Sequence, residues 1–230
     1  MRQREVFQRF ACTDCRAGKV MNMRIQTAID RVSIDEMLRI GGHVYGHTDI
    51  VEVGTSLIKD YGISASVGAM RRQFSDMTIL ADIKTCDEGA YEFRKAFEAG
   101  ADIATVMGFS SDATIQACVS VAEEFGKKCF IDLLEVSDDR LAVLTQKFPD
   151  AILGLHLPSD LQGDGLIQLV REKRSLLGNA GSVAVAGGVK LNNIAYLKSA
   201  AVDIAIVGGA ITKAEDIRGA ARAFSDAARE

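Results

Sequence analysis

The feature that most constrains the fold of this chain is an alternation of two patterns, repeated eight times from residue 24 onward. Short apolar, β-branched runs, which predict buried strands, alternate with longer segments whose apolar residues recur at helical spacing. Two of the predicted helices cover residues 87–99 and 112–125, with Asp87 and Asp112 as their expected N-caps. The eight strand runs are 24–29, 49–53, 78–81, 102–107, 128–131, 151–155, 182–186 and 203–207.

This alternation predicts an α/β fold with a parallel sheet. Eight strand–helix units in about 200 residues fit a (β/α)₈ TIM barrel near its lower size limit. A doubly wound open sheet is the alternative, but it would more often have GxGxxG after its first strand, where this chain reads AIDRVS. Since no linker or change in composition interrupts the pattern, residues 23–230 are predicted to form a single barrel domain.

Residues 1–22 are predicted to be an N-terminal extension that is either disordered or not translated. Met21 and Met23 are both candidate start residues, and Met23 directly precedes the first strand run. The extension contains a single CxxC, formed by Cys12 and Cys15. A zinc site needs a second ligand pair, so a lone CxxC outside a βαβ unit does not predict a metal or redox centre.

Composition and charge exclude several classes of function. The chain has 27 basic and 31 acidic residues, a net charge of −4, and no basic cluster of the kind that binds nucleic acid. It has no apolar run near the ~20 residues of a membrane helix and no apolar signal core at its polar N-terminus. Its five scattered cysteines are not a secreted disulfide framework. These features predict a cytoplasmic protein that binds neither membranes nor nucleic acid.

Ionisable residues gather where the predicted strands end, which in a barrel is where catalytic groups collect. Because side chains two apart on a strand share a face, Asp82 and Lys84 should meet at the barrel mouth. A fixed ammonium beside carboxylates can serve as an acid or as a partner for an oxyanion, and carboxylates such as Glu52 and Asp82 suit Mg²⁺. An ion-pair network that only closes the barrel end remains the alternative. The charged groups at strand ends are Asp30, Glu52, Asp82, Lys84, Asp132 and His156.

His156 ends a strand and is therefore predicted to be an acid–base group, whereas His43 and His47 fall in a helix end and loop and are predicted to be exposed. Strands seven and eight end in the pairs Gly187–Gly188 and Gly208–Gly209. Glycine allows close backbone approach, and the loops after these two strands commonly hold phosphate in barrels. Two tight turns without a ligand are the alternative for these glycine pairs.

Several segments together resemble a known family. The stretch "ADIKTCDEGAYEFRKAFEAGADIATVMG", with "DIVEVGTSLIKDYG", "KKCFIDLL", "VAVAGG" and "DIAIVGGAIT", is similar to the 3-hexulose-6-phosphate synthases of the orotidine-5′-monophosphate decarboxylase suprafamily. The shared Asp-x-Lys-x-x-Asp motif is matched by Asp82, Lys84 and Asp87. The resemblance implies a barrel of the ribulose-phosphate-binding type. It also implies an Mg²⁺-dependent aldol reaction of formaldehyde with D-ribulose 5-phosphate, giving D-arabino-hex-3-ulose 6-phosphate through an enediolate.

The resemblance also implies a role for each site residue. Glu52 and Asp82 would bind Mg²⁺, Lys84 would lie beside the enediolate oxygens, and His156 would move the proton. Asp87 would reach into the partner subunit's site, making the active unit a homodimer. The implied substrate-binding residues are Asp30, Asp132, Gly187, Gly188, Gly208 and Gly209.

Related activities are separated by a few positions. Orotidylate decarboxylase is rejected because its motif continues as Asp-Ile-Pro, where this chain has Glu88–Gly89 after Asp87, and because Gly209–Ala210 replaces its Arg. A 3-keto-L-gulonate-6-phosphate decarboxylase is the alternative. Enzymes of that kind are expected to have an Arg three residues after the sixth-strand histidine, where this chain has Ser159. The loop "HLPSDLQGDG" departs from the synthase pattern but retains the histidine, Asp160 and Gln162. It leaves a second alternative, a sugar-phosphate-binding barrel without catalysis.

Overall fold

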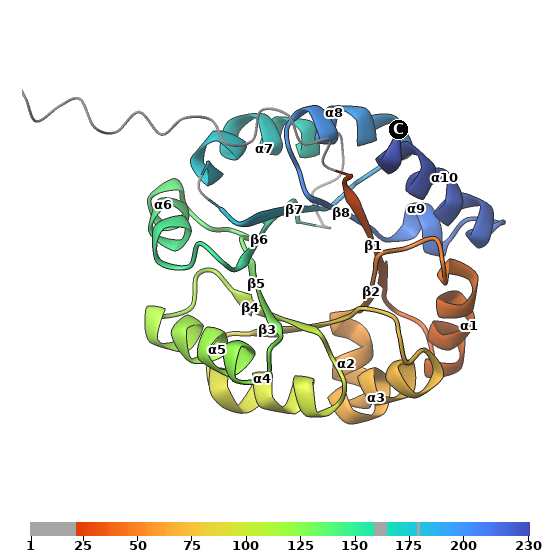
Figure 1. The fold of residues 1–230 in the computed structure, drawn as a ribbon, viewed down its shortest axis with the longest axis horizontal. Helices are drawn as coiled ribbons and strands as arrows, with labels where there is room; N and C mark the ends of the chain where they lie inside the picture. The colour runs from red at the N-terminus through yellow and green to blue at the C-terminus, as the bar shows by residue number, and fades with distance from the viewer. Residues whose placement is uncertain (1–21, 159–164, 179) are drawn as a thin grey trace, which may run out of the picture.

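A computed structural model describes residues 22–158, 165–178 and 180–230, which form a closed barrel of eight parallel strands (Figure 1). The strands follow one another around the barrel in chain order, and β8 pairs with β1 to close it. The predicted (β/α)₈ fold is therefore confirmed. The strands are β1 (Arg24–Ile29), β2 (Ile50–Val53), β3 (Ile79–Thr85), β4 (Ile103–Met107), β5 (Lys128–Asp132), β6 (Ile152–His156), β7 (Ser182–Ala186) and β8 (Ile204–Val207).

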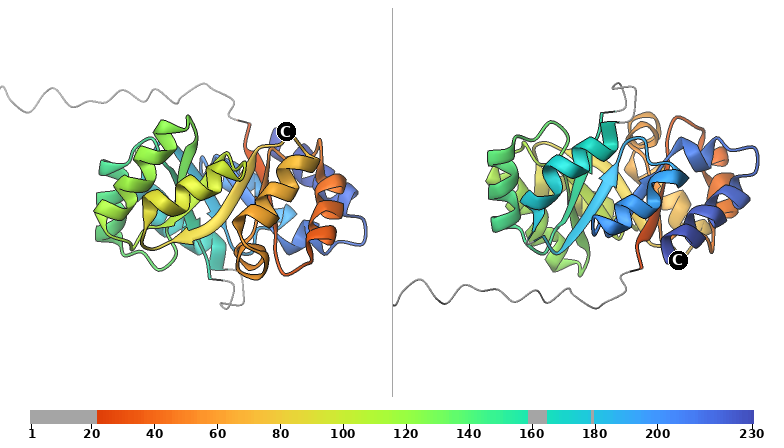
Figure 2. Two further views of the ribbon diagram at one scale, coloured as in Figure 1. Left: turned by 90° about the horizontal axis from the view of Figure 1, so that it is seen from below. Right: turned by 90° about the horizontal axis from the view of Figure 1, so that it is seen from above.

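Helices surround the barrel in a single outer layer, as the two side views show (Figure 2). The described residues form α1 (Ile34–Val44), α2 (Thr55–Tyr61), α3 (Ile63–Gln73), α4 (Gly89–Glu98), α5 (Asp112–Glu124), α6 (Asp138–Lys147), α7 (Gly165–Lys173), α8 (Ile194–Ser199), α9 (Gly209–Thr212) and α10 (Ile217–Arg229), with the 3₁₀ helices η1 (Arg174–Leu177) and η2 (Leu191–Asn193). Among these residues, no helix is both long and apolar enough to cross a membrane.

Both N-caps predicted from the sequence are wrong by one residue. The cap of α4 is Glu88, which adopts a left-handed backbone with φ of 54°, while Asp87 accepts the backbone N–H of Glu88. The cap of α5 is Ser111, whose hydroxyl accepts the N–H of Thr114 at 3.0 Å. Asp112 lies in the first turn instead, where its carboxylate pairs with cations of α6.

Two apolar clusters hold the fold together. The larger lies between the outer faces of the strands and the helices and includes Phe93, Phe97 and Ile115. The smaller fills the middle of the barrel, so that the interior is a packed layer rather than a pore. This layer separates the carboxyl-terminal mouth of the barrel from the opposite one. Its buried members are Ile50, Leu80, Ile103, Phe130, Ile152, Ala184 and Ile204.

Strand β3 is longer than predicted and is irregular at its end. The sequence predicted a strand over 78–81, but pairing with β4 resumes at Thr85 after a register shift that begins at Ala81. Within this bulge, Lys84 adopts a left-handed backbone with φ of 48°, which is unfavourable for a residue with a side chain. Asp82 and Lys84 therefore do not lie on a regular strand, although they do contact each other as predicted.

At the opposite mouth, Asp102 ties three elements together. Its carboxylate pairs with Arg71 of α3, accepts from Lys127 at 2.5 Å, and accepts the backbone N–H of Ile79 at 2.9 Å. Burial alone would raise the pKa of Asp102, but the hydrogen bonds from Lys127 and Ile79 and the charge of Arg71 outweigh it and lower the pKa. The ionised carboxylate thus stabilises the folded state.

We expect Asp102→Asn to lower the free energy of unfolding by about 2 kcal/mol at pH 7. Because the pKa is lower in the folded protein than its ordinary value of 3.8, this stabilisation is present above about pH 4 and is lost at lower pH. Urea unfolding from pH 7 to pH 3 should therefore show the gap between wild type and variant closing. Asp60→Asn, on the exposed side of α2, is the control. A gap that persists unchanged at pH 3 would contradict the assignment.

Candidate active site

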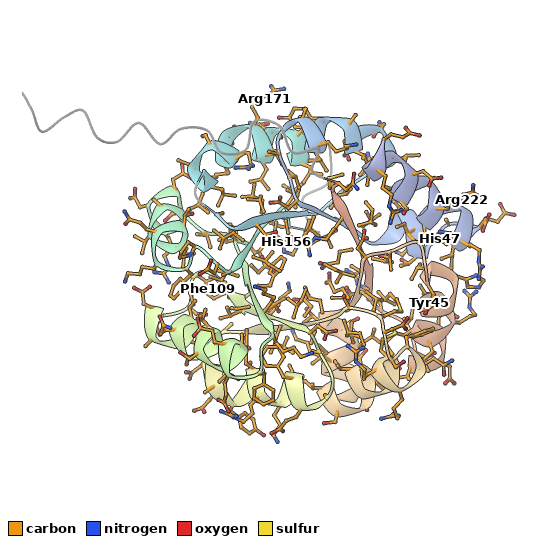
Figure 3. The ribbon with its side chains drawn as sticks, viewed as in Figure 1. Tyr45, His47, Phe109, His156, Arg171 and Arg222 are labelled. Carbon is orange, nitrogen blue, oxygen red and sulfur yellow. The ribbon has the colours of Figure 1, made fainter. Side chains whose placement is uncertain are left out.

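A cavity of about 820 Å³ opens at the carboxyl ends of the strands, and all eight strands contribute to its lining. A second cavity, of about 540 Å³, lies at the opposite mouth and has no histidine in its lining. Side chains drawn on the ribbon show His156 pointing toward the barrel centre, whereas His47 lies near the periphery (Figure 3). The larger cavity brings together most of the residues singled out from the sequence: Asp30, Glu52, Asp82, Lys84, Asp132, His156, Gly187, Gly188, Gly208 and Gly209.

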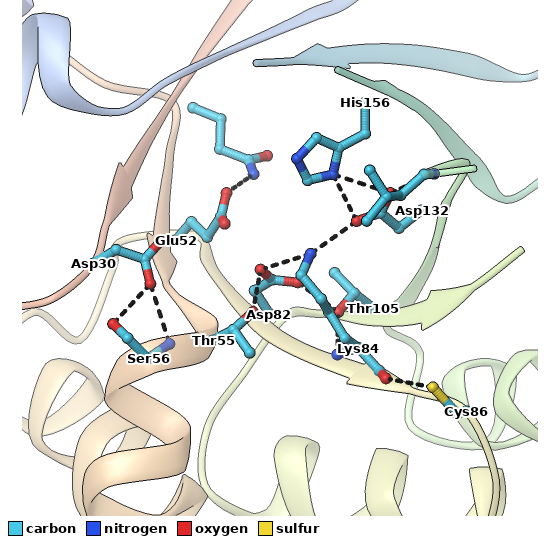
Figure 4. Close-up of polar contacts among 12 residues, drawn as sticks. Asp30, Glu52, Thr55, Ser56, Asp82, Lys84, Cys86, Thr105, Asp132 and His156 are labelled. Atoms are coloured by element: carbon cyan, nitrogen blue, oxygen red, sulfur yellow. Dashed lines mark hydrogen bonds and ion pairs between the residues drawn. The ribbon is translucent and has the colours of Figure 1, made fainter. Parts of the chain in front are cut away.

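Lys84 occupies the centre of the polar network, between two carboxylates (Figure 4). Its Nζ donates to Asp132 Oδ2 at 2.8 Å and lies 3.1 Å from Asp82 Oδ2. Burial disfavours the charge on Lys84, but Asp82 and Asp132 outweigh it and raise the pKa of the ammonium. The side chain therefore stays positively charged at any ordinary pH.

Asp82 is held by two hydroxyl groups that the sequence analysis did not single out. Thr55, at the start of α2, donates to Asp82 Oδ2 at 2.7 Å. Thr105, on β4, donates to Asp82 Oδ1 at 2.9 Å. Threonine is a common residue both at the start of a helix and within a strand. The sequence therefore contained no sign that Thr55 and Thr105 contact Asp82. The two bonds fix the orientation of the carboxylate.

Asp132 links Lys84 to His156. Its Oδ2 lies 2.9 Å from His156 Nδ1, and its Oδ1 accepts the backbone N–H of Leu134 at 2.9 Å. Burial would raise the pKa of Asp132, but the contacts with His156 and Lys84 outweigh it and lower the pKa to about 2. The ionised carboxylate favours a proton on Nδ1 of His156, which leaves Nε2 as the nitrogen that can accept a proton.

Glu52, like Asp82, is buried, and these two carboxylates are the ones predicted to bind a metal. Burial and the neighbouring charge of Asp82 raise its pKa to about 8, and Gln26 donates to its Oε2 at 2.5 Å. Two carboxylates that oppose each other's ionisation would be relieved by a divalent cation, and Mg²⁺ commonly takes only one or two carboxylates. No group of three or more Asp, Glu, His or Cys side chains in the described part of the chain is arranged to hold a metal ion by itself. The pair Glu52 and Asp82 fits an ion that takes its remaining ligands from water or substrate.

Asp30 lies at the rim of the cavity and is fixed by Ser56 of α2. Its Oδ1 accepts from both the Ser56 hydroxyl at 2.8 Å and the Ser56 backbone N–H at 3.1 Å. A Cβ at Gly54 would come within 2.2 Å of this carboxyl group, so the glycine makes room for it. Ser56, like Thr55 and Thr105, is a residue that no pattern in the sequence indicated.

The glycine pairs after β7 and β8 line the same cavity. Gly187 and Gly188 have φ of 92° and 78°, a conformation that favours glycine, and a Cβ at Gly187 would lie 2.2 Å from the carbonyl oxygen of Leu157. Gly208 is the N-cap of α9, and Gly209 is the first residue of that helix. The backbone at Gly187 and Gly188 requires glycine whether or not a phosphate binds there. This geometry therefore fits both the phosphate site and the tight turn predicted from the sequence.

Some of the predicted residues lie elsewhere. Asp87 does not line the cavity and is exposed, as is the neighbouring Cys86, whose thiol donates to the carbonyl of Lys84. His43 and His47 are partly exposed and outside the cavity. Residues 1–21 of the predicted extension, which include Cys12 and Cys15, fall outside the described residues, as do Ser159, Asp160 and Gln162.

Comparison with known proteins identifies the family of this chain. Residues 23–224 match the family described as "Orotidine 5'-phosphate decarboxylase / HUMPS family". The 3-hexulose-6-phosphate synthase of Bacillus subtilis (strain 168) is 36% identical over 198 residues, which cover 84% of this chain and 93% of the relative. A crystal structure of 3-hexulose-6-phosphate synthase from Salmonella typhimurium superposes with a TM-score of 0.84 at 32% identity, over 89% of this chain and 98% of that one. The 3-keto-L-gulonate-6-phosphate decarboxylase of Vibrio cholerae O1 biovar El Tor reaches 0.78 at 25% identity, over 90% and 97%.

The match to the family covers nearly the whole barrel, and the site residues occupy the mouth at which barrel enzymes carry out their chemistry. The chain is therefore an enzyme, a lyase that belongs to the orotidine 5′-phosphate decarboxylase / HUMPS family.

Proposed function

We propose that this enzyme is a 3-hexulose-6-phosphate synthase, which condenses formaldehyde with D-ribulose 5-phosphate to give D-arabino-hex-3-ulose 6-phosphate. The observation that carries the proposal is the ammonium of Lys84 held between Asp82 and Asp132 in the cavity that also contains His156. This arrangement suits a reaction that removes a proton beside a ketone and leaves negative charge on oxygen. The identity of 36% with a relative of that name supports the same activity.

Different residues of the site would contact different parts of the substrate. The glycine pairs Gly187–Gly188 and Gly208–Gly209 would receive the phosphate, and Asp30 and Asp132 would contact the sugar hydroxyls. His156 would take the proton from C1 of ribulose 5-phosphate, with Asp132 holding its ring. The ammonium of Lys84 would stabilise the enediolate oxygens, C1 would then form a bond to the carbon of formaldehyde, and the aldehyde oxygen would be protonated. Phosphate binding far from C1 helps to position the reacting atoms.

Mg²⁺ is the ion that the pair Glu52 and Asp82 would hold. When bound, it would supply a Lewis acid that stabilises negative charge on substrate oxygen, an effect of several kcal/mol. Glu52 would need to be ionised for this role, so metal binding should release a proton from it at neutral pH.

Removal of divalent ions with EDTA should therefore abolish turnover, and added Mg²⁺ should restore it. Glu52→Gln, which keeps the shape of the side chain and removes its charge, should weaken Mg²⁺ binding at least about tenfold. Calorimetric titration with Mg²⁺ measures this without reference to activity, and Glu98→Gln on the exposed face of α4 is the control. Full activity in EDTA, or an unchanged affinity for Mg²⁺ in the Glu52 variant, would contradict the assignment.

A decarboxylase of 3-keto-L-gulonate 6-phosphate is the second candidate, since it would use the same enediolate and has a relative at 25% identity. Two assays side by side decide between them. The synthase should consume formaldehyde in the presence of ribulose 5-phosphate and Mg²⁺ and release no CO₂ from 3-keto-L-gulonate 6-phosphate. The reverse result would favour the decarboxylase, and inactivity on both would favour a barrel that binds sugar phosphate without catalysis.

The active unit is proposed to be a homodimer in which Asp87 enters the partner subunit's site. Asp87 is exposed, and Tyr91 of the following helix α4 is 61% exposed, which leaves apolar area beside this carboxylate for a partner to bury.

Mixed dimers provide the test. We expect Asp87→Asn and Lys84→Ala each to be inactive alone, because each damages every site. Subunits unfolded together and refolded as a mixture should regain about a quarter of the wild-type activity, because half of the dimers then contain one intact site. No recovery from a mixture that refolds to dimers would place Asp87 outside the partner's site.

A further inference from the structure

The hydroxyl of Thr105 lies where the irregular end of β3 meets β4. It donates to Asp82 Oδ1 at 2.9 Å and accepts the backbone N–H of Lys84 at 2.9 Å. The residue is only 2% exposed, so water cannot readily replace either bond. A single hydroxyl group therefore connects the side chain of one predicted catalytic residue to the backbone of the other.

The backbone explains why this link is needed. Between Ala81 and Thr85, β3 advances four residues while its partner β4 advances only two, from Ala104 to Val106. The extra residues leave the ladder, and Lys84 takes a left-handed conformation with φ of 48°. Such a conformation persists in a residue with a side chain only where its surroundings stabilise it. The Lys84 N–H, displaced from the ladder, finds its acceptor in Thr105 instead of a strand carbonyl.

The conformation of this bulge sets the position of the ammonium. The Nζ of Lys84 lies within 3.1 Å of Asp82 and 2.8 Å of Asp132, which sit on different strands. In a regular strand, the side chain of Lys84 would leave the backbone in a different direction. The hydroxyl of Thr105 thus contacts both the carboxylate of Asp82, which pairs with the ammonium, and the backbone of Lys84, which carries the ammonium.

We propose that Thr105 is a positioning residue that holds Asp82 and Lys84 in their reactive arrangement through its hydroxyl. The inference rests on the proposed function for its catalytic consequence, but its geometric content does not depend on which reaction the enzyme performs. Thr105 itself touches no reacting atom in the proposed reaction.

The test compares Thr105→Val, which keeps the shape and removes the hydroxyl, with Thr105→Ser, which keeps the hydroxyl. We expect kcat of the valine variant to fall about a hundredfold with little change in KM for ribulose 5-phosphate, because misplacement by about 1 Å can cost that much. The serine variant should recover most of the loss. Thr145→Val is the control, since Thr145 is also buried and bonds only to a carbonyl within α6.

A second readout is independent of activity. Hydrogen exchange of the Lys84 amide, followed by NMR, should be at least tenfold faster in the valine variant than in wild type or the serine variant. Wild-type kcat in a folded Thr105→Val, equal losses in the valine and serine variants, or unchanged exchange at Lys84 would each overturn the proposal. If the wild type proves inactive on ribulose 5-phosphate, the proposed function fails, whereas the exchange measurement still decides the role of Thr105.

Discussion

Lys84→Ala should lower turnover by at least about a thousandfold while the barrel remains folded, because it removes the charged donor at which substrate oxygen is stabilised. The ammonium lies between Asp82 and Asp132, both of which hold it in the charged form. Nothing else in the described lining places a cation between these carboxylates. Steady-state kinetics with ribulose 5-phosphate and formaldehyde measures the loss, and circular dichroism monitors the fold.

The stability of this variant should also change in a defined way. Without Lys84, the buried carboxylates of Asp82 and Asp132 lose their shared counter-charge, at a cost of about 3 kcal/mol at neutral pH. Lys95→Ala, which removes a partly exposed lysine paired with Glu98, is the matched control and should keep full activity. Substantial turnover in a folded Lys84→Ala would remove this residue from the mechanism.

His156→Gln should lower turnover by a factor of about 10² to 10⁴, the usual contribution of a general acid or base. Asp132 orients the imidazole through Nδ1, so the glutamine variant loses proton transfer but can still fill the space. The clearest measurement uses ribulose 5-phosphate in D₂O without formaldehyde. Wild type should exchange the C1 proton for deuterium, and the variant should exchange it far more slowly.

His43→Gln is the matched control for this experiment. His43 lies in the last turn of α1, beside Arg39 and away from the cavity, so its loss should leave exchange unchanged. Exchange at the wild-type rate in His156→Gln would show that another group takes the proton.

The sequence predicted the architecture because strand and helix patterns are local and repeat eight times. Each strand run needs only buried apolar residues, and closure of the barrel follows from the number of units. Residues at strand ends such as Asp132 and His156 could be placed together on the same basis, since all eight parallel strands present their carboxyl ends at one mouth. Their contact at 2.9 Å follows from that topology and from the adjacency of β5 and β6.

What the sequence could not predict depends on the exact register between strands. The bulge in β3 that gives Lys84 its positive φ has no local marker, such as a glycine, in "ADIKT". Thr55, Thr105 and Gln26 are hydrogen-bond partners of the predicted carboxylates, but threonine and glutamine are ordinary strand or helix-start residues. The misplaced caps at Asp87 and Asp112 have a similar cause, because neighbouring polar residues can each take the cap position.

The decisive measurement for the synthase assignment follows ¹³C-labelled formaldehyde into product by NMR, with ribulose 5-phosphate, Mg²⁺ and the wild-type enzyme. The enediolate mechanism predicts a new carbon–carbon bond, with the label at C1 of a hex-3-ulose 6-phosphate, formed at least about a thousandfold more slowly by Lys84→Ala. Labelled formaldehyde that remains unbonded to sugar carbon, while the enzyme is folded and binds ribulose 5-phosphate, would contradict the synthase assignment.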